Sequence, residues 1–394
     1  MKLRKYNLQQ IKPGMRVLMR VDVNVPIKNG RVQEGALGRL ALTAPDVKRL
    51  IRRKAKVILV SHLGRPKGRV VKTLSLKPIA NRFSKLLGVR VKLAPGVIGA
   101  KVEQMIKKMK PGDVLLLENV RFDPGEEKNS AAFAKELAKL GDIYINDAFG
   151  VCHRKHASVH AITRYLPSYA GRLVQEEVHQ LSQSFAKPLI ILIGGLKLET
   201  KVGLLEKLAP IADAVLVGGG VAISLMGAKY KKSFLVAGKK VPQAELLVAK
   251  RLLDKYGRKI YCPLDLRVSK AKKPHKLQEI NAQLLKVDHH VFDIGPDTEV
   301  FFGRILQTAK SVVWNGPMGI IEDPKAGHGT EFVAKVISQL KKARTILGGG
   351  DTVTFVEKKG YGKGFTLLST GGGAMLAFLA GELLPGLEVL AEED

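Results

Sequence analysis

Short apolar runs that alternate with helical patterns constrain the fold of this chain more than any other feature. Lys56–Val60, with the sequence KVILV, is the continuous apolar, β-branched run typical of a strand buried on both faces of a parallel sheet. Amphipathic patterns such as Gly38–Lys54 and Ser130–Leu140 lie between runs of this kind. Regular alternation of strands and helices predicts an α/β fold with parallel sheets.

The alternation is interrupted once, near the middle of the chain. Gly171–Phe185 has a helical pattern with no strand beside it, and Pro188–Ile193 then begins a second series of strands. A chain of 394 residues is expected to form two or three domains. We therefore predict two α/β domains joined by a helix. The predicted strands are Met15–Val25, Lys56–Val60, Gly112–Leu117 and Asp142–Ile145 in the first half, and Pro188–Ile193, Ala214–Val217, Lys259–Tyr261, Val291–Asp293, Ser311–Trp314, Thr345–Leu347 and Phe365–Leu368 in the second.

Composition argues against several classes of protein. Hydrophobic residues make up 45% of the chain, as in globular domains, and no apolar run approaches the ~18 residues that a membrane span needs. The N-terminus lacks the apolar core of a signal peptide. Cys152 and Cys262 lie far apart in the sequence and indicate no disulfide framework. We expect a cytoplasmic protein with no membrane partner.

The chain carries a large positive charge that is unevenly distributed. The 66 Lys and Arg residues exceed the 35 Asp and Glu residues and give a formal net charge of +31. The residues up to Lys187 contribute +23 of this charge. An excess of this size attracts anions, including nucleic acid and acidic lipid, although a highly charged solvated surface is the simpler explanation.

Glycine-rich turns follow several predicted strands of the second half. Gly371–Gly373 precedes a predicted helix that opens at Ala374, and Gly348–Gly350 and Gly218–Gly220 occupy similar positions. Such turns admit a close ligand, and a helix N-terminus favours phosphate, although each could be a plain strand-to-helix turn. Because parallel strands end at one edge of a sheet, several such turns predict one large phosphate-bearing ligand.

Polar side chains beside these turns extend the predicted nucleotide site. Lys197 and Lys201 follow a glycine turn in the segment GGLKLETK, and Glu322 is a candidate for binding a ribose hydroxyl. Asp351 follows a triple glycine and is a candidate for holding Mg²⁺ that arrives with a nucleotide.

Arginines at strand ends mark a second site in the first half. Arg65, Arg121 and Arg154 lie in segments rich in Gly, Asn, Asp or His, and Arg39 lies near a helix start. Guanidinium groups suit carboxylate and phosphate oxygens, so this set predicts a pocket for a small polyanion. Its other members are Asp22, Asn24 and His62.

Other motifs are missing or incomplete. The chain has no GxxxxGK[ST] motif, GxSxG motif or HExxH motif, and no triple glycine completes GxGxxG, which weakens a dehydrogenase as the alternative α/β enzyme. The segment Cys152–His160 could pass for a zinc cluster, but Arg154 and Lys155 would repel a cation. A basic nucleic-acid-binding protein is the alternative from another class, although aromatics make up only 6% of the residues and are scattered.

Seven segments in order along the chain resemble the motifs of phosphoglycerate kinases. They are RVDVNVP, SHLGRPKG, LENVRF, NDAFG with HRKHAS, WNGPMG, GGGDT and STGGGA, and together they cover nearly the whole chain. The resemblance implies two Rossmann-like domains with an open cleft, at residues 1–170 and 188–376, joined by a helix at 171–187. It also implies that the tail, 377–394, packs back on the N-terminal domain.

The resemblance also implies a reaction and a set of site residues. The expected reaction is reversible phosphoryl transfer from 1,3-bisphosphoglycerate to ADP, with Mg²⁺, by a monomer that binds no specific nucleic acid. No general base is expected, because the acceptor in the reverse direction is an ionised carboxylate. Arg39 and Lys197 would flank the phosphoryl group, with the glycines of STGGGA beside it. The implied residues are Asp22, Asn24, Arg39, His62, Leu63, Gly64, Arg65, Arg121 and Arg154 for the glycerate substrate, Lys197, Lys201, Gly295, Asn315, Glu322, Gly349, Gly350, Asp351 and Thr352 for the nucleotide, and Gly371, Gly372 and Gly373 for the transferring phosphoryl.

The sequence departs from the family pattern near the expected adenine position. The usual GGAKVSDK reads GGLKLETK here, so Leu196 replaces an alanine and Thr200 replaces an aspartate. Ile321 and Ala326 replace aromatic residues that are common after WNGPMG. These changes predict an altered adenine pocket and leave the base preference open.

Overall fold

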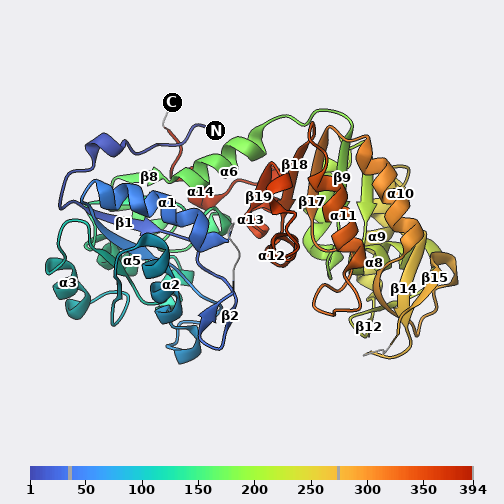
Figure 1. The fold of residues 1–394 in the computed structure, drawn as a ribbon, viewed down its shortest axis with the longest axis horizontal. Helices are drawn as coiled ribbons and strands as arrows, with labels where there is room; N and C mark the ends of the chain where they lie inside the picture. Colours follow the sequence, from blue (N-terminus) through green and yellow to red (C-terminus); the bar gives the residue numbers. More distant parts are fainter. Residues whose placement is uncertain (34–37, 273–275, 393–394) are drawn as a thin grey trace. The chain divides into compact units, whose positions relative to one another are not determined.

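A computed structural model describes residues 1–33, 38–272 and 276–392 of the chain, which form two compact units. Unit 1 comprises Met1–Ser182 and Leu383–Asp394, and unit 2 comprises Gln183–Glu382. Each has the predicted α/β architecture, with helices packed against a parallel sheet (Figure 1). No helix in the described ranges is both long and apolar enough to cross a membrane.

The described residues of unit 1 form a six-stranded parallel sheet with the strand order β5-β6-β4-β1-β7-β8. Its central strands are almost entirely buried, as their continuous apolar sequences require. A short hairpin, β2–β3, precedes α1. The strands are β1 (Arg16–Arg20), β2 (Ile27–Lys28), β3 (Arg31–Val32), β4 (Lys56–Val60), β5 (Val91–Leu93), β6 (Val114–Leu116), β7 (Ile143–Asn146) and β8 (Ser168–Ala170).

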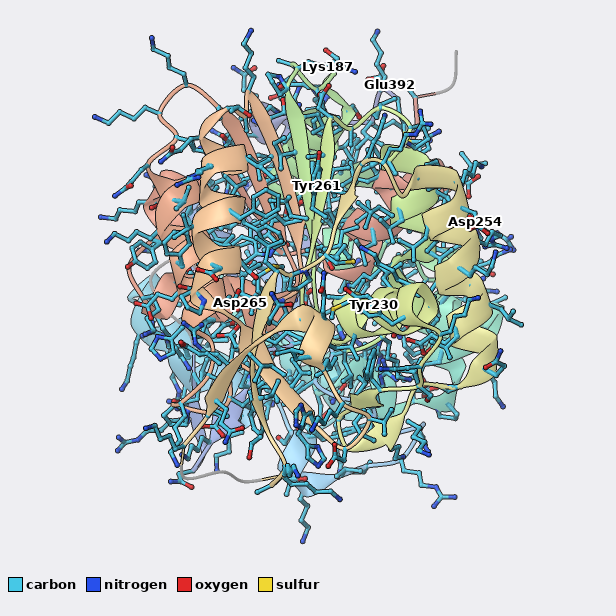
Figure 2. The ribbon with its side chains drawn as sticks, turned by 90° about the vertical axis from the view of Figure 1, so that its right-hand side faces the viewer. Lys187, Tyr230, Asp254, Tyr261, Asp265 and Glu392 are labelled. Carbon is cyan, nitrogen blue, oxygen red and sulfur yellow. The ribbon has the colours of Figure 1, made fainter. Side chains whose placement is uncertain are left out.

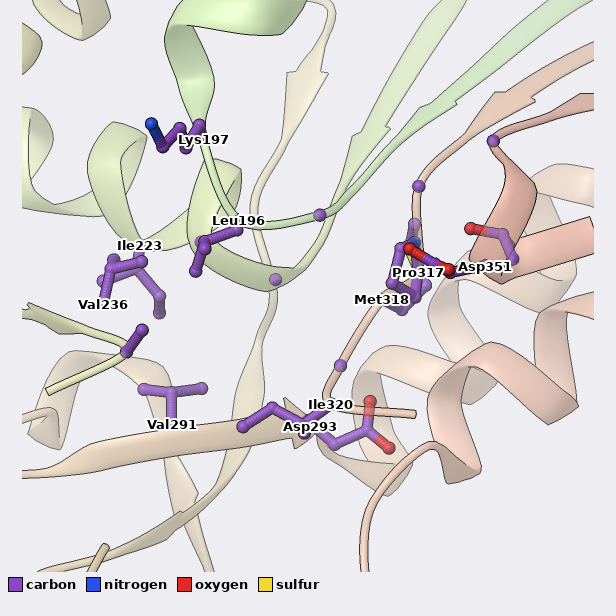
Figure 3. Close-up of a pocket in the computed structure, with 18 of the residues that line it drawn as sticks. Leu196, Lys197, Ile223, Val236, Val291, Asp293, Pro317, Met318, Ile320 and Asp351 are labelled. Atoms are coloured by element: carbon purple, nitrogen blue, oxygen red, sulfur yellow. The ribbon is translucent and has the colours of Figure 1, made fainter. Parts of the chain in front are cut away.

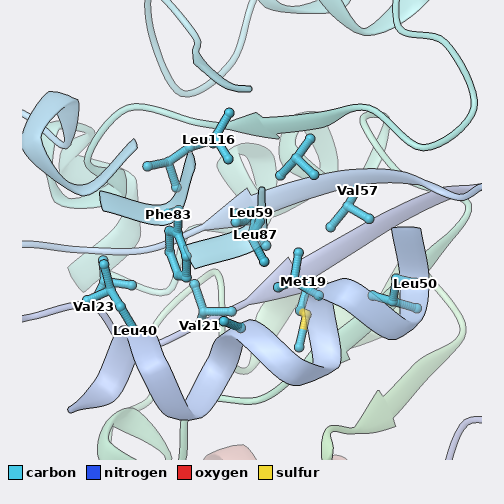
Figure 4. Close-up of a cluster of buried hydrophobic side chains, with 14 of the residues drawn as sticks. Met19, Val21, Val23, Leu40, Leu50, Val57, Leu59, Phe83, Leu87 and Leu116 are labelled. Atoms are coloured by element: carbon cyan, nitrogen blue, oxygen red, sulfur yellow. The ribbon is translucent and has the colours of Figure 1, made fainter. Parts of the chain in front are cut away.

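Helices cover both faces of the unit 1 sheet. Successive strand residues point to opposite faces, so Met19 and Val57 pack on one side and Leu18 and Ile58 on the other. Figure 4 shows α1 lying along the first of these clusters. The helices of unit 1 are α1 (Arg39–Arg52), α2 (Lys77–Leu87), α3 (Ala100–Lys107), α4 (Pro124–Glu127), α5 (Ala131–Ala138), α6 (Arg172–Ser182) and α14 (Pro385–Glu388), with 3₁₀ turns at Leu8–Gln10, Lys72–Leu74, Val120–Phe122, Phe149–Val151 and Ala161–Arg164.

The main sheet of unit 2 is also parallel and has the order β13-β10-β9-β17-β18-β19 in the described residues. Its strands are β9 (Leu189–Ile193), β10 (Ala214–Val217), β13 (Ile260–Tyr261), β17 (Ser311–Asn315), β18 (Arg344–Gly348) and β19 (Leu367–Ser369). The helices of unit 2 are α7 (Val202–Leu208), α8 (Gly219–Tyr230), α9 (Gln243–Tyr256), α10 (Pro296–Gln307), α11 (His328–Ser338), α12 (Gly350–Lys358) and α13 (Gly373–Leu379), with 3₁₀ turns at Leu198–Lys201, Ala282–Leu284 and Gly362–Gly364.

A second, mostly antiparallel sheet in unit 2 corrects the prediction for Val291–Asp293. This run belongs to β16 (His290–Ile294), which lies in the order β12-β11-β16-β14-β15 rather than in the main sheet. Its neighbours were not predicted, because β11 and β12 have two residues each, β15 is polar and mostly exposed, and β14 alternates polar with apolar residues. They are β11 (Leu235–Val236), β12 (Lys239–Lys240), β14 (Asp265–Ser269) and β15 (Gln278–Asn281).

The C-terminal tail packs back on unit 1 from Leu383, later than the predicted start at 377. Helix α13 packs against α7 and therefore belongs to unit 2. In the tail, Leu384, Leu387 and Leu390 are buried, and the Gly386 amide donates to the Cys152 carbonyl at 2.9 Å. The last two residues of the predicted tail lie outside the described residues.

Candidate active site

The predicted anion-binding residues of unit 1 collect at the edge of the sheet where the strands end. Asp22 follows β1 and His62 follows β4, and these two strands pair side by side in parallel. Arg121 lies in the turn after β6, the next strand along. The topology therefore brings together residues that are about a hundred positions apart in the sequence.

Arg20, at the end of β1, is the fully buried centre of this site. Its Nε donates to Ser158 Oγ at 3.0 Å, one Nη donates to the Val21 carbonyl at 2.5 Å, and the other lies 3.1 Å from His62 Nδ1. The buried Glu126 carboxylate accepts from the amide and the hydroxyl of Ser158. The arginine is thus held by a complete set of partners rather than by solvent.

His62 is kept neutral by burial and by four arginines. Burial lowers the pKa of His62 well below its usual value, and the positive charges of Arg20, Arg121, Arg39 and Arg154 lower it further. Because a guanidinium only donates, His62 Nδ1 accepts from Arg20 and the ring proton lies on Nε2. Four cations around one neutral imidazole make a strongly positive pocket suited to a small anion.

Arg39 is held at the start of α1 by the segment that follows β1. Its Nη1 donates to the Asn24 carbonyl at 2.7 Å and lies 3.3 Å from Asp22 Oδ1. The Asn24 side-chain oxygen in turn accepts from the Gly64 amide at 3.0 Å. These bonds join the turns after β1 and β4 and hold the arginine head at the sheet edge.

The remaining predicted residues of unit 1 lie around this centre. Arg121 is almost fully buried and donates to the Gly64 carbonyl at 2.8 Å, while burial and the charge of Arg154 lower the pKa of Arg121 to about 10. Leu63 is buried, and its carbonyl accepts from Asn119. Arg65 directly follows Gly64 and is exposed, and it forms no hydrogen bond or ion pair with another described residue.

Unit 2 contains a pocket of about 620 Å³ at the ends of β9, β17 and β18. One half is apolar, and Figure 3 shows Leu196, Ile223, Val236 and Val291 there, away from Asp351. The other half contains glycine turns and polar residues, with Pro317 and Met318 beside Asp351. An apolar region beside polar groups suits a nucleoside phosphate.

Several glycines of unit 2 allow turns to pack closely on one another, and of the predicted turn Gly218–Gly220 both Gly219 and Gly220 also line the pocket. A Cβ at Gly194 would lie 2.0 Å from the Pro317 carbonyl oxygen, and one at Gly220 would lie 2.2 Å from the Leu196 carbonyl oxygen. Gly349, with a φ of +107°, has only ordinary contacts on its open side. Among these turns, Gly349–Gly350 at the start of α12 is the better candidate for direct approach to phosphate.

The two predicted lysines occupy different environments. Lys201 is largely buried, its Nζ bonds to Asn315 Oδ1, and burial lowers the pKa of Lys201 to about 8. Lys197 is exposed, and its Nζ lies 3.4 Å from Glu199. Both lysines line the pocket, so the site has one ammonium group held in place, that of Lys201, and one exposed to solvent, that of Lys197.

Glu322, Asp351 and Thr352 also line the pocket, as predicted for a nucleotide site. Asp351 is exposed in the first turn of α12, whereas Thr352 is buried. In the described ranges, no group of three or more His, Cys, Asp or Glu residues could hold a metal ion. Asp351 alone fits Mg²⁺ that arrives with a nucleotide, because such sites use one or two carboxylates and the phosphates.

Four predicted glycines lie outside this pocket. Gly295 precedes α10 and gives room to a side chain, since a Cβ there would lie 2.2 Å from an Asp265 carboxylate oxygen. Gly371–Gly373 follows β19, at the same sheet edge but beyond β18. The structure therefore gives Gly295 a packing role and does not bring it to the nucleotide pocket.

Two functional residues were missed by sequence reasoning. Arg20 could have been found, because a charge inside a continuous buried strand needs partners. Asp293 lines the unit 2 pocket, is almost fully buried and accepts from the Gly329 amide at 2.9 Å. Burial raises the pKa of Asp293 to about 6. No motif marked it.

An arginine-lined anion site on one α/β unit and a nucleotide-sized pocket on the other are typical of a small-molecule kinase. The phosphoglycerate kinase family model matches residues 8–382. The phosphoglycerate kinase of Moorella thermoacetica is 43% identical over 387 residues, and that of Thermomicrobium roseum is 41% identical over 389. These alignments cover 96% of this chain and 96% and 97% of the relatives.

Solved structures agree with the sequence relatives. The phosphoglycerate kinase from Pyrococcus horikoshii OT3 has a TM-score of 0.86 at 31% identity, with 98% of each chain covered. The enzyme from Coxiella burnetii has a TM-score of 0.78 at 33% identity, with 97% of this chain and 98% of the other covered. The chain belongs to the phosphoglycerate kinase family, which confirms the predicted fold class and a phosphotransferase activity between 1,3-bisphosphoglycerate and ADP in glycolysis.

Proposed function

We propose that the reaction is divided between the two units. Unit 1 binds 3-phosphoglycerate or 1,3-bisphosphoglycerate through the arginine cluster, and unit 2 binds ADP or ATP in its pocket. The observation that carries the proposal is the convergence of Arg20, Arg39, Arg121 and Arg154 on neutral His62. This charge favours a small, multiply charged anion, whereas the unit 2 pocket has the apolar half that a base requires.

We propose that Arg39 and Lys197 stabilise the phosphoryl group as it moves between the substrates. Phosphoryl transfer needs alignment and neutralised charge more than it needs covalent participation by the protein. The carboxylate that accepts the phosphoryl group is ionised at pH 7, so no side chain has to remove a proton. Transfer requires that the two ligands be aligned and that water be excluded.

Within unit 1, we assign the neutral imidazole of His62 a hydrogen-bonding role. Its Nε2–H can donate to a substrate oxygen without adding another positive charge to the crowded site. Arg20 holds the ring in this tautomer. The buried arginine therefore acts through His62 and is a positioning residue.

We propose that Asp351 would hold Mg²⁺ that arrives with the nucleotide, where the ion would supply positive charge to neutralise the phosphates. Lys201 and the amides at Gly349–Gly350 bind the phosphates of the same nucleotide. We further propose a monomeric, cytoplasmic enzyme whose substrate sites take no nucleic acid.

Arg39→Ala tests the catalytic proposal. A cation directed at developing charge acts in the transition state, and comparable arginines contribute about 10³–10⁵ in rate. We expect kcat to fall at least a hundredfold while ATP affinity, measured by calorimetry, stays within twofold. Arg82→Ala, an arginine on α2 away from the cluster, is the matched control. A loss of kcat below about tenfold would remove Arg39 from the catalytic role.

A further inference from the structure

The edge of the unit 1 sheet where the strands begin forms one continuous surface. Backbone bonds join its loops, since the Gly14 amide donates to the Lys54 carbonyl at 2.8 Å and the Gly112 amide to the Ala55 carbonyl at 3.0 Å. The Asp142 amide donates to the Arg16 carbonyl at 2.8 Å. The loops before β1, β4, β6 and β7 therefore meet at the edge opposite the arginine cluster.

Positive charge dominates this surface, which we call the basic edge. Its acids are already engaged, because Asp113 accepts from the Lys110 amide, Glu136 pairs with Lys139, and Asp142 pairs with Arg16. The edge carries ten cations, namely Lys12, Arg16, Arg52, Arg53, Lys54, Lys56, Lys107, Lys108, Lys110 and Lys139, against these three acids and Glu103, whose negative charge lies near Lys139. Figure 4 shows Leu50 and Val57 at the end of the core near this edge and Val23 and Leu40 at the other end.

Helix ends account for only part of this charge. A cation at a helix C-terminus is stabilised by the helix dipole, and α1, α3 and α5 end here. The end of α1 nevertheless carries Arg52, Arg53 and Lys54 in succession, and none of them forms an ion pair with another described residue. Clustered like charges repel one another and destabilise the fold, so stability does not explain the cluster.

The chemistry of the edge favours a phosphate backbone as its partner. The loops that form the edge, at residues 11–15, 53–55, 108–113 and 139–142, contain no aromatic residue, so base stacking has no support there. None of the exposed large hydrophobic residues lies on these loops, so insertion into a membrane has none either. Figure 2 shows nitrogen-tipped side chains elsewhere on the surface as well, and the loops before the unit 2 strands are joined by similar backbone bonds, such as that from the Arg344 amide to the Lys310 carbonyl at 2.9 Å.

The dimensions of the edge also fit a duplex. Four neighbouring strands cover ~14 Å at ~4.8 Å per spacing, before the flanking helix ends are added. Duplex DNA presents one negative charge per ~1.7 Å of its axis, or about eight charges over that length, of which roughly half face one side. We propose that the basic edge binds the phosphate backbone of duplex nucleic acid without reading its sequence, independently of the substrate site.

A salt-dependent titration tests this proposal. The probe is a fluorescein-labelled 25-base-pair DNA duplex, and its anisotropy is followed at NaCl concentrations from about 50 to 200 mM. Contact with about four phosphates predicts a log–log slope between about −3 and −5, so affinity falls about a hundredfold over this range. A saturating concentration of 3-phosphoglycerate should not displace the duplex.

Two matched triple variants test whether duplex binding depends on the basic edge itself or only on the net charge of the protein. Arg52→Glu/Lys107→Glu/Lys108→Glu alters the basic edge, and Lys341→Glu/Lys342→Glu/Lys363→Glu alters exposed lysines of unit 2 by the same charge. We expect the first to lower duplex affinity at least tenfold and the second less than threefold, with kinase activity retained in both. The same two triples made with Gln repeat the comparison if a Glu variant fails to fold.

Three results would overturn the proposal. Equal losses in the two triple variants would show that total charge, and not this surface, binds the duplex. Displacement by 3-phosphoglycerate would place the duplex in the substrate site. Binding to vesicles of phosphatidylserine and phosphatidylcholine, with no duplex binding at 50 mM NaCl, would assign the edge to an acidic membrane.

Discussion

Single buried charges determine what each site of this protein can bind. Arg20 lies within an apolar strand and is fully paired, and its position next to His62 fixes the tautomer of that ring. Lys201 is buried next to Asn315, which makes its charge sensitive to ligands. The sequence indicated Lys201 through its glycine turn. A charge within the apolar strand could have marked Arg20, but its partner Ser158 could not be predicted, because this residue lies in a turn after β7 and meets Arg20 only in the fold.

The burial of Lys201 predicts a pH-dependent affinity for nucleotide. Burial lowers the pKa of Lys201 to about 8, so the free protein loses this charge as the pH rises through 8. Bound phosphates favour the charged form and raise this pKa, so binding takes up protons above pH 8. We expect ATP affinity to fall as the pH rises from 7 to 9.5, with proton uptake seen by calorimetry in two buffers of different ionisation enthalpy.

Lys201→Met removes this titration and serves as the comparison. The variant should bind ATP more weakly at pH 7 and show no proton uptake near pH 9. Lys197→Met, which alters the exposed lysine of the same pocket, should retain the pH dependence. Equal proton uptake in wild type and Lys201→Met would assign the titration to another group.

We predict that the base pocket has adapted to Leu196, so that this side chain contributes to nucleotide binding. Its side chain is 54% exposed at the apolar half of the pocket, and its carbonyl packs under Gly220. A leucine in this position can cover a bound base, so we expect Leu196→Ala to lower ATP affinity about threefold to tenfold, in line with one or two lost apolar groups at ~0.8 kcal/mol per methylene. Calorimetry measures this, and a clear gain in affinity would show that the leucine crowds the base.

At the scale of elements, buried parallel strands were predicted well and the second sheet of unit 2 was not. The bounds of β4 and β10 match their predicted runs, because a strand covered on both faces is apolar throughout. β15 is polar and mostly exposed, so its sequence does not differ from that of a loop. β11 was missed as well, although Leu235 and Val236 form part of the apolar wall of the pocket.

The first turn of helix α6 is capped by the buried carboxyl group of Asp147, and the pKa of this group leads to a second prediction about pH. Asp147 Oδ1 accepts from the Leu173 amide at 2.7 Å, and a Cβ at Gly171 would lie 2.2 Å from the same oxygen. Burial and the nearby Asp46 raise the pKa of Asp147 to about 8. The folded state therefore binds a proton that the unfolded state releases near pH 4, so this group lowers stability as the pH rises from about 4 to 8.

Asp147→Asn should remove that loss and keep the cap. We expect its thermal midpoint to exceed that of wild type by little at pH 5 and by much more at pH 8.5. Asp147→Ala should have a lower midpoint than Asp147→Asn at both values, because a lost cap costs about 1 kcal/mol. A lower midpoint for Asp147→Asn at pH 8.5 would contradict the account.

Asp142→Asn is a matched control, because the pKa of Asp142 is shifted in the opposite direction from that of Asp147. Burial raises the pKa of Asp142, but hydrogen bonds and the charge of Arg16 lower it by more, so its net shift is downward. Its ionised form stabilises the fold above the ordinary pKa of an aspartate, and this contribution is lost as the pH falls. Asp142→Asn should therefore lower the thermal midpoint at pH 8.5.

At the scale of the whole molecule, two units of one architecture carry sites of different chemistry. The alternation of strands and helices predicted both units, and parallel topology explains why distant motifs meet at each sheet edge. Sequence alone could not separate glycines that pack on other turns, such as Gly194 and Gly218, from those open to a ligand, because the difference depends on contacts made only in the fold. It also could not place the tail boundary at Leu383, which is set by the packing of α13 on α7.

The division of substrates between the units is tested most directly by one pair of variants and two ligands. Arg65→Ala in unit 1 and Lys201→Met in unit 2 are each titrated by calorimetry with 3-phosphoglycerate and with MgATP at pH 7. We predict that Arg65→Ala weakens 3-phosphoglycerate binding about tenfold and leaves MgATP within twofold, and that Lys201→Met does the reverse. Equal weakening of both ligands in either variant would contradict the two-site account.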